Sequence, residues 1–247
     1  MCRPGCSLPP PLTLPYRAGV PARRDARPLD GLKLGLYREW FEDADGDIVS
    51  ACNDAVSTLE SLGATTVPIK IPELDSARVA HTCIISCEMY QTYGALATAD
   101  PSIWDKLALD IKVSQKSSSM FTASDLLQSQ KIRNRTTVFF NRVFEKVDLI
   151  VTPTTAISAP RIAPGVGKQG ESNLEQLSKI MRFVVTANLT GFPAMSVPVG
   201  YDSEGLPIGL QLMGRPWCEA TLIDCASKLE RALGPPRKPQ VALGVLG

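Results

Sequence analysis

The chain has 247 residues, enough for one large domain or two small ones. An apolar fraction of 44% supports a sizeable core and excludes a disordered protein, and 26 basic against 25 acidic residues leave no cationic excess for binding nucleic acid. No apolar run approaches the ~18 residues of a membrane span, so a transmembrane helix is excluded as well.

The first segment, residues 1–29, is rich in proline and arginine. Proline at this density blocks both helix and central strand, so we expect a disordered leader over 1–29, a folded domain over 30–235 and a flexible tail over 236–247. The arginines are compatible with an organelle transit peptide, but the scarcity of serine favours a plain flexible start.

A strand–helix–strand unit opens the predicted domain. LKLGLY (32–37) has the composition of a strand, apolar residues recur at helical spacing from Asp47 to a stop at Gly63, and ATTVPIK (64–70) is β-branched and extended. Two strands joined by a helix imply a parallel pair with a right-handed crossover.

A helical region follows. Helices are expected over 73–96 and over 102–113, the second capped by Asp100. Thr122 and Asp125 resemble a capping box that opens a long helix to about Val147. Its basic run (Lys131, Arg133 and Arg135) either contacts a membrane surface peripherally or forms a solvated face.

Seven cysteines, an odd number at low density, argue against a disulfide scaffold and for a reducing compartment. Cys83 and Cys87 share a helical face, whereas the single histidine, His81, points away from them. Because a zinc site would need two further ligands, we expect no metal at these cysteines and interpret both as structural.

The last third of the chain combines strands and helices. DLIVTP (148–153) is typical of a buried strand, and Ser172 with Glu175 suggests a capping box for a helix that ends near Asn188. The runs 194–200 and 208–214 predict a hairpin, and a final helix ends near Gly234. This pattern predicts an α/β class.

Two segments of this region carry a family resemblance. DLIVTPTT (148–155) and NLTGFPAMSVPVGYDSEGLPIGLQLMGRPWCEATL (188–222) together resemble the closing segment of the amidase signature family. The DGLKLGLY start, the Gly63 turn and the KIRNR helix are similar to its fatty acid amide hydrolase branch, in the plant-type form. The resemblance implies the C-terminal half of the amidase-signature fold, a mixed sheet flanked by helices, and chemistry without metal or cofactor.

The resemblance also implies substrate contacts. In fatty acid amide hydrolases the helix before this hairpin lines an acyl-chain channel, which assigns apolar substrate contact to Phe183, Val184 and Ala187. Thr152 and Thr154 lie at the carboxyl end of their strand, where open α/β sheets place ligands. For each residue taken singly, simple packing in a core is an equal alternative.

No catalytic residue is assigned. Enzymes of this family use a serine nucleophile, a second serine and a lysine base, with both serines in a Gly-Ser-Ser-Gly-Gly-Ser loop, and the 247 residues contain no such loop. Lys116 beside the serine run 117–119 lacks the glycines, and Ser196 lacks a neighbouring base. We therefore expect a half-fold that is inactive alone, exposes strand edges and one apolar sheet face, and pairs with an amino-terminal half or a second copy.

Three functions follow from these expectations. The first is an inherited, truncated hydrolase of fatty acid amides such as N-acylethanolamines, located in the cytoplasm or peripherally on an internal membrane. The second is a non-catalytic module that binds or regulates through the acyl-amide wall. The third is a fragment like the amidase-type component of glutamyl-tRNA amidotransferase, for which Arg215 is the single candidate to bind a free carboxylate.

Overall fold

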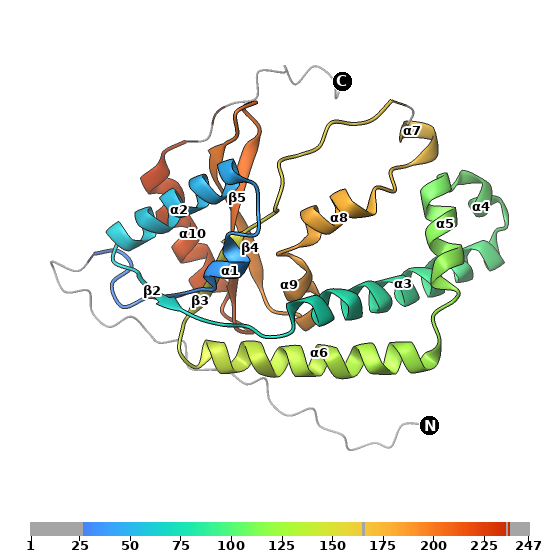
Figure 1. Ribbon diagram of the computed structural model, residues 1–247, viewed down its shortest axis with the longest axis horizontal. Coiled ribbons are helices and arrows are strands. Elements are labelled where there is room, and N and C mark those ends of the chain that lie inside the picture. The colour runs from blue at the N-terminus through green and yellow to red at the C-terminus, as the bar shows by residue number, and fades with distance from the viewer. Residues whose placement is uncertain (1–26, 165, 236, 238–247) are drawn as a thin grey trace.

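The computed structural model describes residues 27–164, 166–235 and 237. Their core is a five-stranded mixed sheet in the order β2-β1-β3-β5-β4 (Figure 1). Most of the predicted leader and tail lies outside the described residues. Leu29, which we assigned to the leader, is 4% exposed, and its N–H donates to the carbonyl of Leu62, so it belongs to the folded core.

The predicted strand–helix–strand unit is present and parallel. Strand β1 (Lys33–Leu36) is followed by α1 (Arg38–Phe41) and α2 (Gly46–Ser61), and β2 (Thr65–Pro68) pairs with β1 in parallel register. Gly63 ends the α2 segment with φ 111°, and a Cβ at this position would lie 2.4 Å from a carboxylate oxygen of Asp30. Only glycine satisfies both conditions without strain, which confirms the predicted stop.

The rest of the sheet is built from the C-terminal third. Strand β3 (Leu149–Pro153) runs parallel to β1 and antiparallel to β5 (Pro207–Gly214), which forms the predicted hairpin with β4 (Ala194–Tyr201). The hairpin shifts register between Pro198 and Gly200. Strands β2 and β4 are the edges of this sheet.

Helices cover both faces of the sheet. One apolar cluster joins α2 and α10 (Glu219–Leu233) to the strands, and a second joins α1, α6 (Ala123–Phe144) and α9 (Val185–Thr190) to the other face. All five residues of β3 are buried. The predicted exposed apolar sheet face is therefore wrong for the described residues, because helices from before and after β3 cover both faces.

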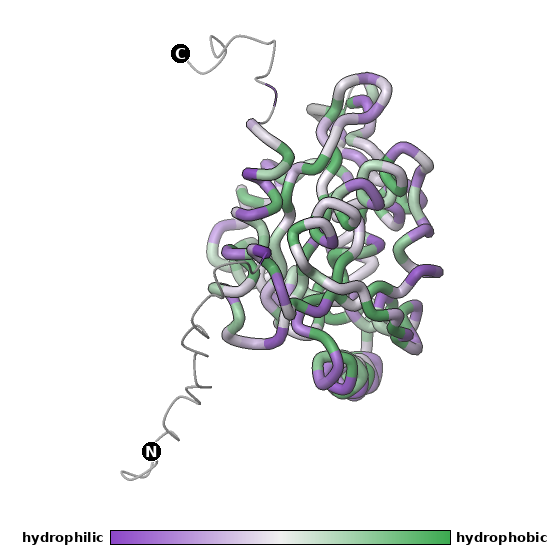
Figure 2. The backbone as a smooth tube through the Cα atoms, turned by 90° about the vertical axis from the view of Figure 1, so that its left-hand side faces the viewer, coloured by the Kyte–Doolittle hydropathy of each residue, from purple (hydrophilic) through white to green (hydrophobic). Residues whose placement is uncertain are grey.

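The helical region extends to one side of the sheet, with α3 (Leu74–Ala99) and α6 (Ala123–Phe144) alongside each other (Figure 1). The Thr122–Asp125 capping box is confirmed. In Figure 2, α6 is seen nearly end-on at the bottom of the molecule and carries both hydrophilic and hydrophobic turns. Among the described helices, none combines the length and the apolar composition that crossing a membrane requires.

Between α3 and α6 the structure corrects the sequence analysis. The single helix expected over 102–113 is two helices, α4 (Ser102–Lys106) and α5 (Leu109–Ser118), because Leu107 and Ala108 are extended. Asp100 still bonds the first turn, since its carboxylate accepts from the N–H of Ser102. Two serines of the run 117–119 lie in the last turn of α5, and Ser118 is buried and donates to the carbonyl of Ser114.

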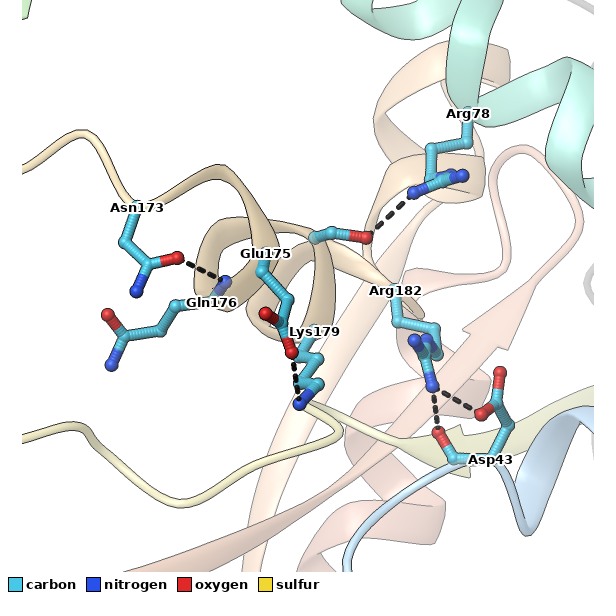
Figure 3. A network of polar contacts seen from close by, with 8 residues as sticks. Asp43, Arg78, Asn173, Glu175, Gln176, Lys179 and Arg182 are labelled. Carbon is cyan, nitrogen blue, oxygen red and sulfur yellow. Dashed lines mark hydrogen bonds and ion pairs between the residues drawn. The ribbon is translucent and has the colours of Figure 1, made fainter.

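A second correction concerns the segment before the hairpin. After α7 (Val166–Gln169), helix α8 (Leu174–Met181) is capped by Asn173, whose side chain accepts from the N–H of Gln176, and not by Ser172 with Glu175. The single helix expected to reach Asn188 is interrupted before α9 (Val185–Thr190). The interruption includes Arg182 and Phe183. The Arg182 side chain donates to the carbonyl of Asp43 (Figure 3), and the Phe183 carbonyl accepts from the side chain of Gln211.

Candidate functional site

Two hydroxyl groups meet at the carboxyl end of β3. Thr154 Oγ1 and Ser196 Oγ lie 2.6 Å apart, and the Thr154 N–H donates to the carbonyl of Gly209 on β5 at 2.8 Å. A Cβ on Gly209 would lie 2.6 Å from Ser196 Oγ and 2.8 Å from Thr154 Oγ1. Glycine at 209 is therefore what allows the two hydroxyls to approach across the strand between them.

A cavity of about 450 Å³ opens beside this hydroxyl pair. Its other walls are mostly apolar and come from α2, the loop after β3, α8 and the hairpin: Ile48, Ile157, Ala159, Pro160, Ile180, Pro198, Pro207 and Ile208. An apolar cavity with a few convergent polar groups is the usual form of a small-molecule site. Its chemistry suits an apolar chain that ends in a hydrogen-bonding group.

A buried amide joins the strands to the turn between α8 and α9. Gln211 Nε2 donates to Thr152 Oγ1 at 2.9 Å and to the carbonyl of Phe183 at 3.1 Å, and both Thr152 and Gln211 are almost fully buried. Phe183 has no exposed surface and packs on Trp40 with ring centroids 5.6 Å apart. Thr152 and Phe183 thus position the cavity wall rather than line the cavity.

The five residues predicted to contact substrate therefore lie in different environments. Thr154 lines the apolar cavity, whereas Ala187 is buried in the second apolar cluster and Val184 is half-buried in the turn. The sequence analysis missed Gln211 and Ile180, and it considered Ser196 only as a nucleophile. Gln211 had a usable signal, because a polar residue inside the apolar strand IGLQLMG must find a buried partner.

The described residues hold no assembled nucleophile. Ser196 shares its hydrogen bond with another hydroxyl, and no serine in the described ranges is hydrogen-bonded to a lysine or histidine side chain. His81 is buried on α3, and burial lowers the pKa of its imidazole against an opposing effect of Glu88. No group of three or more side chains among the described residues has an arrangement that could hold a metal ion.

Arg215 has a structural role. Its Nη2 donates to the carbonyl of Phe144 at 2.7 Å and to that of Val147 at 3.4 Å, which satisfies backbone groups left free at the end of α6. The amidotransferase hypothesis needs Arg215 to bind a free carboxylate, but its guanidinium group already donates to these backbone carbonyls.

The five-stranded mixed sheet and its helical cover define an α/β protein. The solved structure of 6-aminohexanoate cyclic dimer hydrolase with its substrate superposes with a TM-score of 0.69 at 22% identity, over 97% of this chain and 52% of that chain. At this identity the similarity shows the fold alone.

The chain belongs to the amidase family, whose model matches residues 20–223. It is 43% identical over 230 residues to fatty acid amide hydrolase of Medicago truncatula, covering 90% of this chain and 37% of the relative. It is 34% identical to a component of glutamyl-tRNA(Gln) amidotransferase from Geobacter metallireducens, covering 82% and 45%. The chain thus spans less than half the length of these two relatives.

Proposed function

We propose that these 247 residues form the substrate-binding wall of an amidase that acts on fatty acid amides. The observation that carries the proposal is the apolar cavity beside the Thr154–Ser196 hydroxyl pair. Isoleucines and prolines accommodate an acyl chain, and the two hydroxyls provide hydrogen-bonding partners for an amide group at its end. The similarity to plant fatty acid amide hydrolases supports the same substrate class.

The proposal assigns binding, and not the nucleophile, to this chain. Attack on the amide carbonyl needs an activated nucleophile within hydrogen-bond reach of a base, and neither the sequence nor the described side chains provide one. The proposal requires the Gly-Ser-Ser-Gly-Gly-Ser loop to come from outside these 247 residues, as in an amino-terminal half. A second copy of this chain would lack the loop too and could complete only the fold. We also propose a cytoplasmic protein or one held peripherally on an internal membrane.

The test is binding of a radiolabelled long-chain N-acylethanolamine to the full chain by equilibrium dialysis. Ile180→Asn places an amide in the cavity wall and should weaken binding roughly 10- to 150-fold, since burial of one such side chain contributes ~1.5–3 kcal/mol. Leu177→Asn, on the exposed face of the same helix and outside the cavity lining, is the matched control and should bind like the wild type.

Equal weakening by both variants, or the absence of saturable binding, would contradict the proposed site. A fluorophosphonate probe should leave the wild-type chain unlabelled. Stoichiometric labelling of any serine would show that the chain carries its own nucleophile.

The non-catalytic binding module remains a second candidate, favoured by the same cavity. It differs from the first in one measurable respect. Mixing this chain with the amino-terminal part of a plant relative should restore amide hydrolysis if the chain supplies half of an enzyme, and should leave hydrolysis at background if it acts only by binding.

A further inference from the structure

A second cavity, of about 280 Å³, lies where the three helices α3, α6 and α9 meet, and it shares no residue with the apolar cavity (Figure 1). Helix α3 contributes side chains of one face, at positions 81, 84, 85 and 88. Helix α6 contributes Arg133, and α9 contributes residues 188 and 189. Sites for drug-sized ligands have volumes of roughly 300–1,000 Å³, so this cavity suits a smaller molecule.

His81 brings a buried imidazole to this cavity. The residue is 8% exposed, and no hydrogen bond joins its side chain to another residue in the part of the chain that the structure describes. Burial lowers the pKa of this imidazole, so the ring is neutral at pH 7 and offers one hydrogen-bond donor and one acceptor. Buried polar side chains are normally hydrogen-bonded, and a ligand in the cavity can provide the partner that His81 lacks in the protein.

Two opposite charges from different helices line the same cavity, Glu88 of α3 and Arg133 of α6. Among the described residues neither forms an ion pair, with the other or with any third residue. The Arg133 guanidinium donates to the side-chain oxygen of Gln130 at 3.5 Å, the outer limit of a hydrogen bond. Asn188 adds an amide that both donates and accepts. A carboxylate and a guanidinium thus border one small cavity with space between them.

From this arrangement we propose that the cavity binds a free aliphatic α-amino acid by its zwitterionic head group. The ammonium group pairs with Glu88, the carboxylate pairs with Arg133, and the His81 ring hydrogen-bonds the head group between them. An ion of one sign would be attracted by one of these charges and repelled by the other, whereas a zwitterion is attracted by both. The buried residues Ile84 and Leu189 provide apolar contact for an aliphatic side chain. The inference does not depend on the proposed amide-binding function, because the two cavities share no residue.

The experiment is isothermal titration calorimetry of the full chain with three ligands of the same carbon skeleton. Leucine carries both charges, 4-methylpentanoate lacks the ammonium group, and leucinol lacks the carboxylate. Leucine should bind saturably, and each analogue should bind about tenfold more weakly, as expected for the loss of one charge-assisted hydrogen bond. This comparison uses only the wild-type chain, so it decides the question even if a variant fails to fold.

Variants then assign each charge to its partner. Glu88→Gln should weaken leucine about tenfold and leave 4-methylpentanoate unchanged or tighter, because that ligand has no ammonium group to lose its partner. Arg133→Gln should likewise weaken leucine and spare leucinol. The matched controls are Glu145→Gln and Arg142→Gln, which remove the same charges from exposed positions at the end of α6, outside the cavity lining. Thermal melts establish that each variant is folded.

Three results would overturn the inference. The first is no saturable heat with leucine, and the second is binding of either analogue as tight as that of leucine. The third is an equal weakening of leucine and 4-methylpentanoate by Glu88→Gln, which would show that this carboxylate does not bind the ammonium group. Weakening of leucine by the two control variants as large as that by Glu88→Gln and Arg133→Gln would exclude this cavity as the site.

Discussion

Replacement of Gln211 tests whether its buried amide holds the turn between α8 and α9 against the sheet. In Gln211→Met the side chain keeps nearly the same length but donates no hydrogen bond to Thr152 or Phe183. The buried Phe183 carbonyl then keeps only the Thr186 hydroxyl, a donor at 3.4 Å, and Thr152 Oγ1 loses its amide donor. The substitution should therefore reduce the free energy of unfolding by about 2–4 kcal/mol. For a chain of this size the loss lowers Tm by roughly 4–16 °C.

The assay is thermal unfolding by circular dichroism of the wild type and four variants. Thr152→Val removes one partner and should lose about 1 kcal/mol, and the double variant should lose less than the sum because the two side chains share one hydrogen bond. Gln128→Met, on the exposed face of α6, should change Tm by little. The reasoning is refuted if Gln211→Met melts within the range of Gln128→Met, because the buried amide would then contribute nothing.

Three further predictions concern the cap, the cavity and the thiols. Thr122→Ala removes the capping box of α6 and should cost about 1 kcal/mol in the free energy of unfolding, whereas Thr122→Ser should retain most of it; equal losses would argue against the cap. Gly209→Ala forces a Cβ against the hydroxyl pair and should lose about 1–3 kcal/mol, while Gly46→Ala, with open space around its Cβ, should be neutral or stabilising. Burial raises the pKa of the Cys52 and Cys225 thiols from 9.0 to about 12, so the folded chain should resist iodoacetamide at pH 8 at these two positions. Because the folded state keeps these protons while the unfolded state releases them, stability should fall between pH 9 and 12; rapid alkylation of either thiol, or a stability that rises over that window, would contradict the burial.

Features that depend on residues close together in the chain could be predicted from the sequence. The Thr122–Asp125 box, the glycine stop at Gly63 and the hairpin 194–214 each depend on a few neighbouring residues and on backbone preferences. The family resemblance likewise rests on contiguous motifs, and the family match covers them. Errors occurred where a local signal competed with distant contacts, as at Ser172, where Asn173 caps the helix instead.

The site itself was decided by tertiary structure. The sequence by itself determined which residues end strands and which helices are amphipathic, because those properties depend on neighbours along the chain. It did not determine that Thr154 meets Ser196, that Gln211 reaches Phe183, or that Glu88 and Arg133 line one cavity. Those pairings join segments far apart in the chain, and strand order and crossover direction, which only the folded sheet establishes, bring them together.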